Sequence, residues 1–381
     1  MPKSASTVLK AGSVWLFLAV VFLVPIVYLP WTTDKLEINK QLVLVIGLGL
    51  SSTFYLLSLA IEKRSLPRPS WLLLGPVLIL IATCASASSS LALATSWFGE
   101  GAQAYVSVVT LIGSIFLFLL AREFIATPAA VHRLLAVMFT SSAIVGVASP
   151  WVNLVGTPHA VGVYLLVMSM LACGYALTSV RDGAEPRLYK RYVTVASTIT
   201  YLACLGVLLA LDSTVLWGLT IIGALTLFLI ALKHAEQFQQ PMKFMPTLVL
   251  FIMAVIFVFL PTNFPSPFLQ EVSPTLGTSL NIVSGAWQES SPWLGTGPGT
   301  FGFMYSKYVA ADVNQTPFWE LIMDRGNAYI TTQLATVGVF GVLVWLFFVV
   351  SIFVLTLKRI LTARAGWRQL VPWFAAWVAM V

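Results

Sequence analysis

The stretch YITTQLATVGVFGVLVWLFFVVSIFVLTL, residues 329–357, contains no charged side chain and is followed directly by Lys358 and Arg359. A helix of about 20 apolar residues crosses the hydrocarbon core of a bilayer, so the stretch predicts a membrane-spanning helix. In the whole chain of 381 residues, 59% are hydrophobic and 9% are charged. Soluble domains are about 45–50% apolar and about 25% charged. The composition therefore excludes a soluble enzyme, a disordered tail and a nucleic-acid-binding domain.

Similar apolar runs recur along the sequence. Nine further complete runs lie near 11–30, 41–61, 70–86, 104–121, 131–149, 159–179, 192–211, 213–232 and 244–261. An eleventh begins near 370 and stops at Val381 in mid-run, so we expect the natural protein to continue. Only helices and closed barrels satisfy their backbone polar groups inside a bilayer. We therefore expect an all-α integral membrane protein, a polytopic bundle of about 10–12 transmembrane helices.

The basic residues predict the orientation. If the N-terminus is cytoplasmic, 17 of the 21 Lys and Arg residues fall on the cytoplasmic side. The other side then holds only Lys35, Lys40, Lys307 and Arg325. Cytoplasmic loops of membrane proteins are enriched in Lys and Arg. We expect a plasma (inner) membrane protein with a cytoplasmic N-terminus.

One connection is much longer than the others. Residues 262–328 form a predicted extracytoplasmic loop between the transmembrane regions 1–261 and 329–381. The loop is rich in aromatic residues, unlike a disordered linker. SLNIVSGAWQES (279–290) and FGFMYSKYVAAD (301–312) are predicted to form short helices at the membrane interface, with aromatic rings at headgroup depth. The alternative interpretation is that some of these rings stack on sugars.

The loop contains an unusual glycine pattern, PWLGTGPGTFGFMY, residues 292–305. Gly295, Gly297 and Gly299 alternate around Pro298, which predicts a rigid turn with exposed amides. Such a nest of N–H groups can hold an anion, although a purely structural turn is an equal interpretation. Neither a phosphate loop nor a dinucleotide fingerprint fits, because the Lys-Ser/Thr pair and the βαβ context are missing.

The predicted spans lack the features of an ion-coupled transporter. No Asp, Glu, Lys, Arg or His falls at the centre of any span, where coupled transporters place ionisable groups. A lipid or polysaccharide transporter of flippase type remains the alternative function. Cys84, Cys173 and Cys204 lie in apolar runs without metal-ligand spacing and are expected to be packing residues. We predict no metal and no cofactor.

The glycine turn and the segment after it, NQTPFWELIMDRGNAYITTQLATVGVFGVLVWLFFVV (314–350), together resemble the core region of the O-antigen ligase family. This superfamily also contains O-antigen polymerases and bacterial O-oligosaccharyltransferases. The stretch LPWTTDKLEINKQ (29–41) is similar to the first outer loop of the family. Many members have a histidine where Gly326 precedes Asn327, and an arginine ahead of the turn that is missing from TSLNIVSGAW (278–287). We therefore expect a divergent member.

The resemblance implies a membrane glycosyltransferase. Its donor is an isoprenoid-pyrophosphate-linked glycan, and its acceptor is a glycan, lipid or protein on the outer face. The resemblance leaves open whether the activity is that of a ligase, a polymerase or a protein-glycan transferase. Membrane lipids are the other expected partner. Arg325, which can bind two phosphate oxygens, and Asp324 are the predicted catalytic residues, and the alternative interpretation is that both only mark a helix entry at the interface. Candidate general bases are Asp324, Glu320 and His159, and the predicted substrate-binding residues are Lys307, Lys40, Gly295, Gly297, Gly299, Asn327 and His159.

Overall fold

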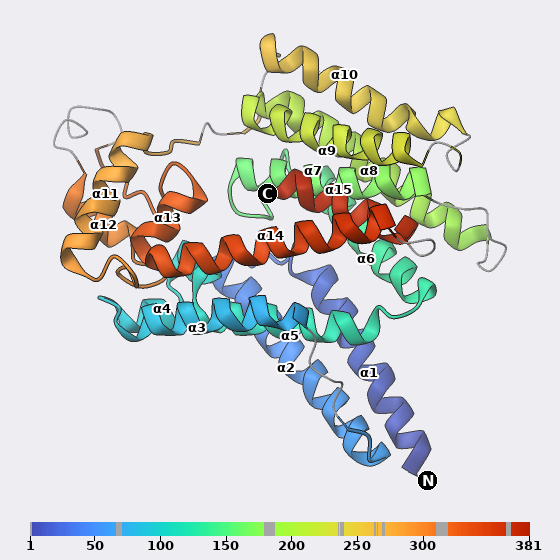
Figure 1. Cartoon of the computed structure of the whole chain (residues 1–381), viewed down its shortest axis with the longest axis horizontal. Helices are drawn as coiled ribbons and strands as arrows, with labels where there is room; N and C mark the ends of the chain where they lie inside the picture. Colours follow the sequence, from blue (N-terminus) through green and yellow to red (C-terminus); the bar gives the residue numbers. More distant parts are fainter. Residues whose placement is uncertain are drawn as a thin grey trace. The chain divides into compact units, whose positions relative to one another are not determined.

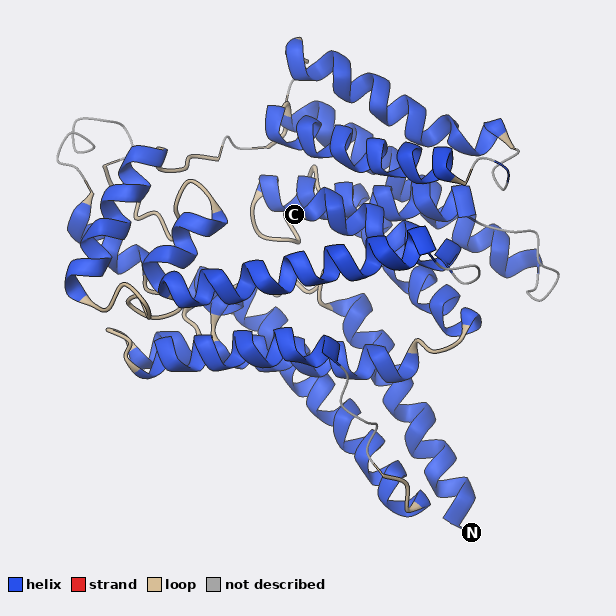
Figure 2. Cartoon of the chain, in the orientation of Figure 1, coloured by secondary structure: helices blue, strands red, loops and turns tan. Residues whose placement is uncertain are grey.

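The computed structural model describes residues 2–65, 71–178, 187–234, 236, 240–262, 264, 266–268, 271–309, 319–362 and 367–381. Within these residues the chain is helical and has no strand (Figures 1 and 2). Nine helices in the described part are long and apolar enough to cross a bilayer. The prediction of an all-α, multi-pass membrane protein is confirmed at this level.

The nine helices match nine of the predicted runs. They are α1 (Pro2–Leu23), α2 (Glu37–Glu62), α3 (Leu74–Ser88), α6 (Pro128–Ala148), α7 (Pro158–Thr178), α8 (Arg187–Leu211), α9 (Thr214–Lys233), α10 (Met245–Phe259) and α14 (Gly338–Thr362). Short 3₁₀ turns, η1 (Trp71–Leu73) and η4 (Pro241–Phe244), precede α3 and α10. The tenth run, 104–121, corresponds to a 3₁₀ segment η2 (Gly101–Val106) and the 17-residue helix α5 (Val108–Phe124). The last run forms η6 (Trp367–Gln369) and α15 (Leu370–Met380).

The span predicted over 329–357 begins later than expected, because two helices occupy this range. Helix α13 (Tyr329–Thr336) ends at Val337, and α14 begins at Gly338, whose φ is +74°. A left-handed residue cannot continue a right-handed helix. A Cβ at Gly338 would lie 2.5 Å from the carbonyl oxygen of Trp293, so only glycine allows this approach. The amides of Val339 and Phe340, in the first turn of α14, donate to the carbonyls of Pro292 and Trp293.

The two short helices expected between residues 262 and 328 are present as α11 (Leu276–Glu289) and α12 (Phe301–Tyr308). Residues 310–312 of the second predicted helix lie outside the described residues. The two helices share a buried apolar cluster with α13: Ile282, Val283, Ala286, Phe301, Met304, Tyr305 and Ala335. The indole Nε1 of Trp287 donates to the carbonyl of Leu334 at 3.0 Å. This segment is therefore folded, and its position at a membrane interface stays a prediction.

The chain divides into two compact units, each built from separate parts of the sequence. The first contains Met1–Val20, Val27–Ala126 and Val272–Val349, and the second contains Val21–Ile26, Thr127–Glu271 and Val350–Val381. The first unit therefore combines α11–α13 with the early helices. The second unit has its core around α7, which packs against α6, α8, α9 and α15. Cys173 and Cys204 are buried in that core, as expected for packing residues.

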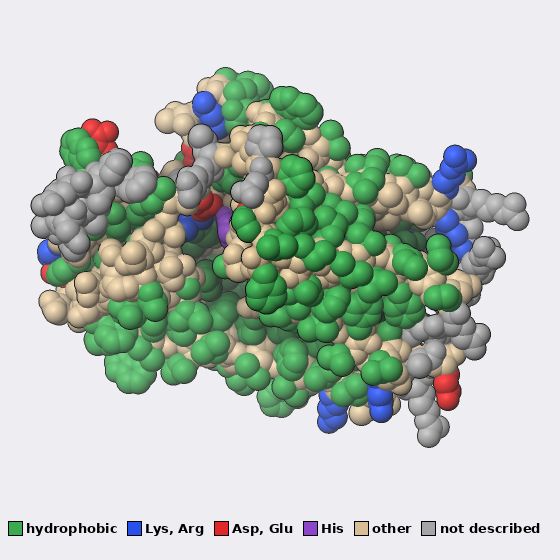
Figure 3. Space-filling model, turned by 90° about the horizontal axis from the view of Figure 1, so that it is seen from above, with side chains coloured by type: hydrophobic (Ala, Val, Ile, Leu, Met, Phe, Trp, Pro, Cys, Tyr) green, Lys and Arg blue, Asp and Glu red, His purple; other side chains and the backbone are tan. Residues whose placement is uncertain are grey.

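The outer surfaces of the long helices are apolar. Large hydrophobic side chains are exposed on α2, α9 and α10, among them Ile46, Leu50, Leu229 and Ile252. Hydrophobic side chains also dominate much of the face seen in Figure 3. Exposed apolar patches of this size are unfavourable in water, so this surface supports a bilayer as the solvent.

Candidate functional site

The glycine turn of residues 292–300 contains three glycines with left-handed backbone angles. Gly295, Gly297 and Gly299 have φ values of +65°, +110° and +76°. All three are buried. Because L side chains rarely adopt these angles, the glycine pattern is a conformational requirement.

The amides of this turn are occupied by the protein itself. The amide of Gly295 donates to the carbonyl of Ser291 at 2.8 Å, and that of Gly297 donates to the carbonyl of Thr336 at 2.8 Å. The amide of Thr296, between them, donates to the carbonyl of Ala335. The expectation that Gly295 and Gly297 expose their amides is therefore wrong. The amides of Thr296 and Gly297 attach the turn to the C-terminal end of α13, and substrate binding by Gly299 stays a prediction.

Segment 86–96 fixes the other side of the turn. The hydroxyl of Ser96, in α4 (Leu93–Phe98), donates to the carbonyl of Pro298 at 2.8 Å. The hydroxyl of Ser86 donates to the carbonyl of Thr336 at 2.9 Å, so that this oxygen accepts from both the turn and α3. The amide of Leu91 donates to the carbonyl of Thr296 at 3.0 Å. The turn thus forms a rigid buried wall.

Asp324 and Arg325 form a two-point ion pair on the loop before α13. The Nε and one terminal nitrogen of Arg325 lie 2.9 Å and 3.3 Å from the two carboxylate oxygens of Asp324. The side chain of Arg325 is 37% exposed and that of Asp324 is 27% exposed, so the pair is accessible from outside the protein. An arginine that already binds a carboxylate with two nitrogens has the geometry to bind a phosphate in the same way.

Hydroxyl groups hold the backbone of this loop. The amide of Gly326 donates to Oγ1 of Thr332 at 2.9 Å, and the amide of Asn327 donates to Oγ of Ser279 at 2.8 Å. The amide of Ala328 donates to Oγ1 of Thr331 at 3.2 Å. Three successive amides are thus fixed by side chains of α11 and α13. Asn327 itself is exposed, and its predicted role in substrate binding stays a prediction.

A charged residue at the start of α2 interacts electrostatically with the Asp324–Arg325 pair. The charges of Lys40, Asp34, Arg325 and Asp324 all act on the carboxylate of Glu37. Oδ1 of Asp34 accepts from the amides of Leu36 and Glu37 and so caps α2. Two of the four cations predicted for the outer side, Lys40 and Arg325, therefore both act electrostatically on Glu37. Sequence reasoning did not identify Glu37, although it lies in the quoted stretch 29–41.

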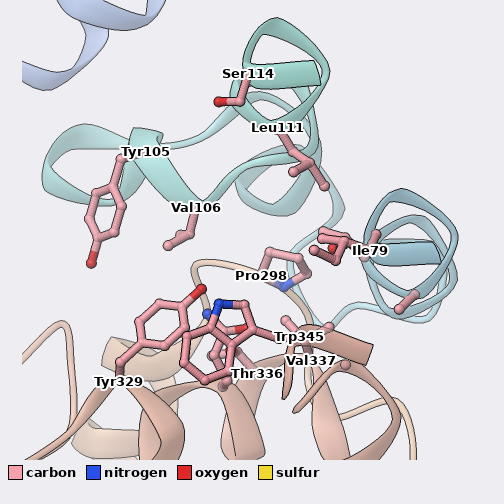
Figure 4. A pocket seen from close by; sticks show the side chains of 14 residues that line it. Ile79, Tyr105, Val106, Leu111, Ser114, Pro298, Tyr329, Thr336, Val337 and Trp345 are labelled. Atoms are coloured by element: carbon pink, nitrogen blue, oxygen red, sulfur yellow. The ribbon is translucent and has the colours of Figure 1, made fainter. Parts of the chain in front are cut away.

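Two adjoining cavities lie beside the loop and the turn. The larger encloses about 160 Å³. Figure 4 shows Tyr105 and Val106 on one side of it, Tyr329 and Trp345 on the other, and Pro298 between them. Its walls are mostly apolar. The smaller, of about 10 Å³, includes Asp324 and shares Tyr105, Val106, Gln333 and Thr336 with the larger one. An apolar cavity thus adjoins the acidic member of the ion pair.

The other predicted residues have different surroundings. Lys307 is exposed and donates to Glu289 at 2.6 Å, linking α12 to α11. Hydrogen bonds from Lys307 and Tyr308 hold the pKa of Glu289 below its usual range. Glu320 is exposed in a turn. His159 begins α7 in the second unit, where its amide donates to the carboxylate of Glu271 at 3.3 Å. The predicted roles of Lys307, Glu320 and His159 stay predictions.

The described residues contain no group of three or more His, Cys, Asp or Glu side chains that could hold a metal ion. The chain was compared with protein-family models, curated proteins and solved structures, and none of them matches it.

Proposed function

We propose that the protein is a membrane glycosyltransferase of the O-antigen ligase type. It would transfer a glycan from an isoprenoid pyrophosphate to an acceptor on the outer face of the inner membrane. One observation carries the proposal: in the first unit, the charges of Asp324, Arg325 and Lys40 all act on the carboxylate of Glu37 at the start of α2, and Asp324 also lines a cavity that adjoins a larger apolar one. A donor that combines a pyrophosphate with a long apolar chain needs both features.

The distribution of basic residues supports the outer location of this site. With a cytoplasmic N-terminus, the outer side holds only Lys35, Lys40, Lys307 and Arg325. Fixed cations are therefore scarce on that side, and Lys40 and Arg325 are close enough to act on one carboxylate, that of Glu37. Such a pair suits the two phosphates of the leaving group.

The proposed reaction begins with an exchange of partners at Arg325. The pyrophosphate of the donor replaces the carboxylate of Asp324 on the guanidinium, which frees that carboxylate. An acceptor hydroxyl oxygen then attacks the anomeric carbon of the donor sugar and forms the new glycosidic bond. The bond between that carbon and the pyrophosphate oxygen breaks, and its electron pair leaves with the pyrophosphate. The proton of the acceptor hydroxyl passes to Asp324, which acts as the general base.

The larger cavity supports a binding place for the apolar part of the donor. Its walls include Ile79, Val106, Leu111 and Val337, and the rings of Tyr329 and Trp345 pack with centroids 5.3 Å apart. An isoprenoid chain can pass from the bilayer to such walls without a desolvation cost, because lipid tails are as apolar as these side chains. A chain seated there would bring its pyrophosphate to the neighbouring ion pair.

Transfer in a reconstituted system tests this proposal. Purified protein in liposomes receives a fluorescent lipid-pyrophosphate-linked glycan and one of three acceptors: a second lipid-linked glycan, a lipooligosaccharide or a protein. We expect a transferred product with one acceptor and an equal amount of released lipid pyrophosphate. Movement of the labelled glycan across the membrane without transfer would instead support the flippase alternative. The acceptor that reacts distinguishes polymerase, ligase and protein-glycan transferase.

A further inference from the structure

A glutamine side chain outside the proposed reaction steps borders the Asp324–Arg325 loop. Gln103 lies in η2, and its Nε2 donates to the backbone carbonyl oxygen of Asp324 at 3.3 Å. A carbonyl oxygen only accepts hydrogen bonds, so the NH₂ end of the amide must face Asp324. This contact fixes the orientation of the amide and directs Oε1 away from the carbonyl.

The Oε1 atom of Gln103 is buried and has no hydrogen-bond partner in the described part of the chain. Native proteins seldom leave a buried acceptor without a donor, because its lost hydration is not replaced. The described part of the chain therefore leaves this acceptor open to a hydrogen-bond donor such as a water molecule or a ligand.

The space beside this atom fits one oxygen atom. The smaller cavity, of about 10 Å³, is lined by Gln103, Asp324, Gly299 and Thr332, among others. A cavity of this size holds about one water molecule. A Cβ on Gly299 would lie 3.4 Å from Oε1, so the glycine turn closes this side of the amide without filling it.

The chemistry of the cavity selects a hydrogen-bond donor. Gln103 Oε1 can only accept, and the carboxylate of Asp324 is negative and also only accepts. Beside these two groups, a phosphate oxygen would meet an acceptor and a like charge. A neutral hydroxyl group satisfies Oε1 with its hydrogen.

We propose that Gln103 determines substrate specificity by accepting a hydrogen bond from a sugar hydroxyl through Oε1. A water molecule takes the same position when no substrate is bound. This inference rests on the proposed function, because it supplies the sugar. The hydroxyl belongs either to the acceptor or to the donor sugar. The acceptor is favoured, because Asp324 lines the same cavity and is the proposed base.

Kinetics with one variant and one matched control test the role. Gln103→Met keeps the length of the side chain but removes both the carbonyl acceptor and the amide donor. Gln288→Met makes the same change at an exposed position of α11. We expect Gln103→Met to raise the KM of one substrate roughly tenfold, the effect of one lost hydrogen bond in a buried site, and Gln288→Met to match the wild type. The substrate whose KM rises identifies the source of the hydroxyl.

Monodeoxy analogues of both sugars separate recognition from positioning. For the wild type, the KM of one analogue should be roughly tenfold higher than that of the parent sugar. Gln103→Met should no longer distinguish that analogue from the parent sugar. If Gln103 only holds the Asp324 loop, Gln103→Met would lower kcat equally for every analogue. That result, or kinetics equal to those of Gln288→Met, overturns the proposal.

A density map of the substrate-free protein gives a readout that does not need activity. At a resolution that shows water, an oxygen should lie within hydrogen-bond distance of Gln103 Oε1. An empty cavity overturns the proposal. If the wild type transfers no glycan, the proposed function fails, and this map alone decides whether the cavity binds a hydroxyl-sized donor.

Discussion

The amide of Gly297 donates to the carbonyl oxygen of Thr336 at 2.8 Å, across 39 residues of sequence. This bond joins the glycine turn to the last residue of α13, where the following residues reverse into α14. The same oxygen accepts from the hydroxyl of Ser86 in α3. Three segments that are distant in sequence therefore meet at one atom, and the walls of both cavities depend on it.

Gly297→Ala should destabilise the protein. At φ +110° an alanine is strained, and its Cβ would lie 2.0 Å from Oγ of Ser90. We expect a loss of about 2–5 kcal/mol, combining left-handed strain and overpacking. Thermal unfolding in detergent measures this loss. Gly277→Ala is the control, because a Cβ there meets nothing nearer than 3.9 Å and lies in α11. Equal melting temperatures for the two variants would contradict the structural role of the turn.

Arg325→Ala should reduce the rate of glycan transfer by about 100-fold or more, on the scale of one lost transition-state donor. Arg325→Lys should recover only part of the rate, because an ammonium group cannot make the two-point contact. Transfer rate per folded protein is the measurement. Lys35→Ala, an exposed change in the first outer loop, serves as the control. A fully active Arg325→Ala variant would remove Arg325 from the mechanism.

The orientation can be checked with impermeant thiol labelling. Ser273→Cys and Gln240→Cys are introduced separately, with Cys84, Cys173 and Cys204 replaced by alanine. Both positions are exposed in the structure. The distribution of Lys and Arg predicts that intact cells label residue 273 and not residue 240. The reverse pattern would place Arg325 on the cytoplasmic side and would refute the proposed outer-face reaction.

Glycan transfer should continue in the presence of a chelator. The reason is that Arg325 and Lys40 provide fixed positive charge for the leaving pyrophosphate, which is one of the ways enzymes stabilise developing negative charge. The measurement compares initial rates with and without excess chelator. An activity lost in chelator and restored by a divalent cation would show that these side chains are insufficient.

Local sequence patterns predicted most of the helices but not their junctions. Apolar runs predicted nine of the spans, and the glycines of the 292–300 segment predicted a turn. The break at Gly338 was missed because a lone glycine within an apolar run is compatible with a continuous helix. The amide of Gly297 was wrongly predicted to be exposed because its acceptor, Thr336, is distant in the sequence. Gln103 was missed for the same reason, since its contact with Asp324 spans 221 residues.

The contact between Arg325 and Asp324 also sets a threshold for binding. A carboxylate tethered next to the guanidinium competes with every incoming anion at a high effective concentration. The phosphate of an ordinary anionic phospholipid carries a single negative charge, and a membrane surface presents many of them. A pyrophosphate carries more charge, so under the proposed function it competes better with this carboxylate. Asp324 thereby raises the charge density that an anion needs in order to bind Arg325.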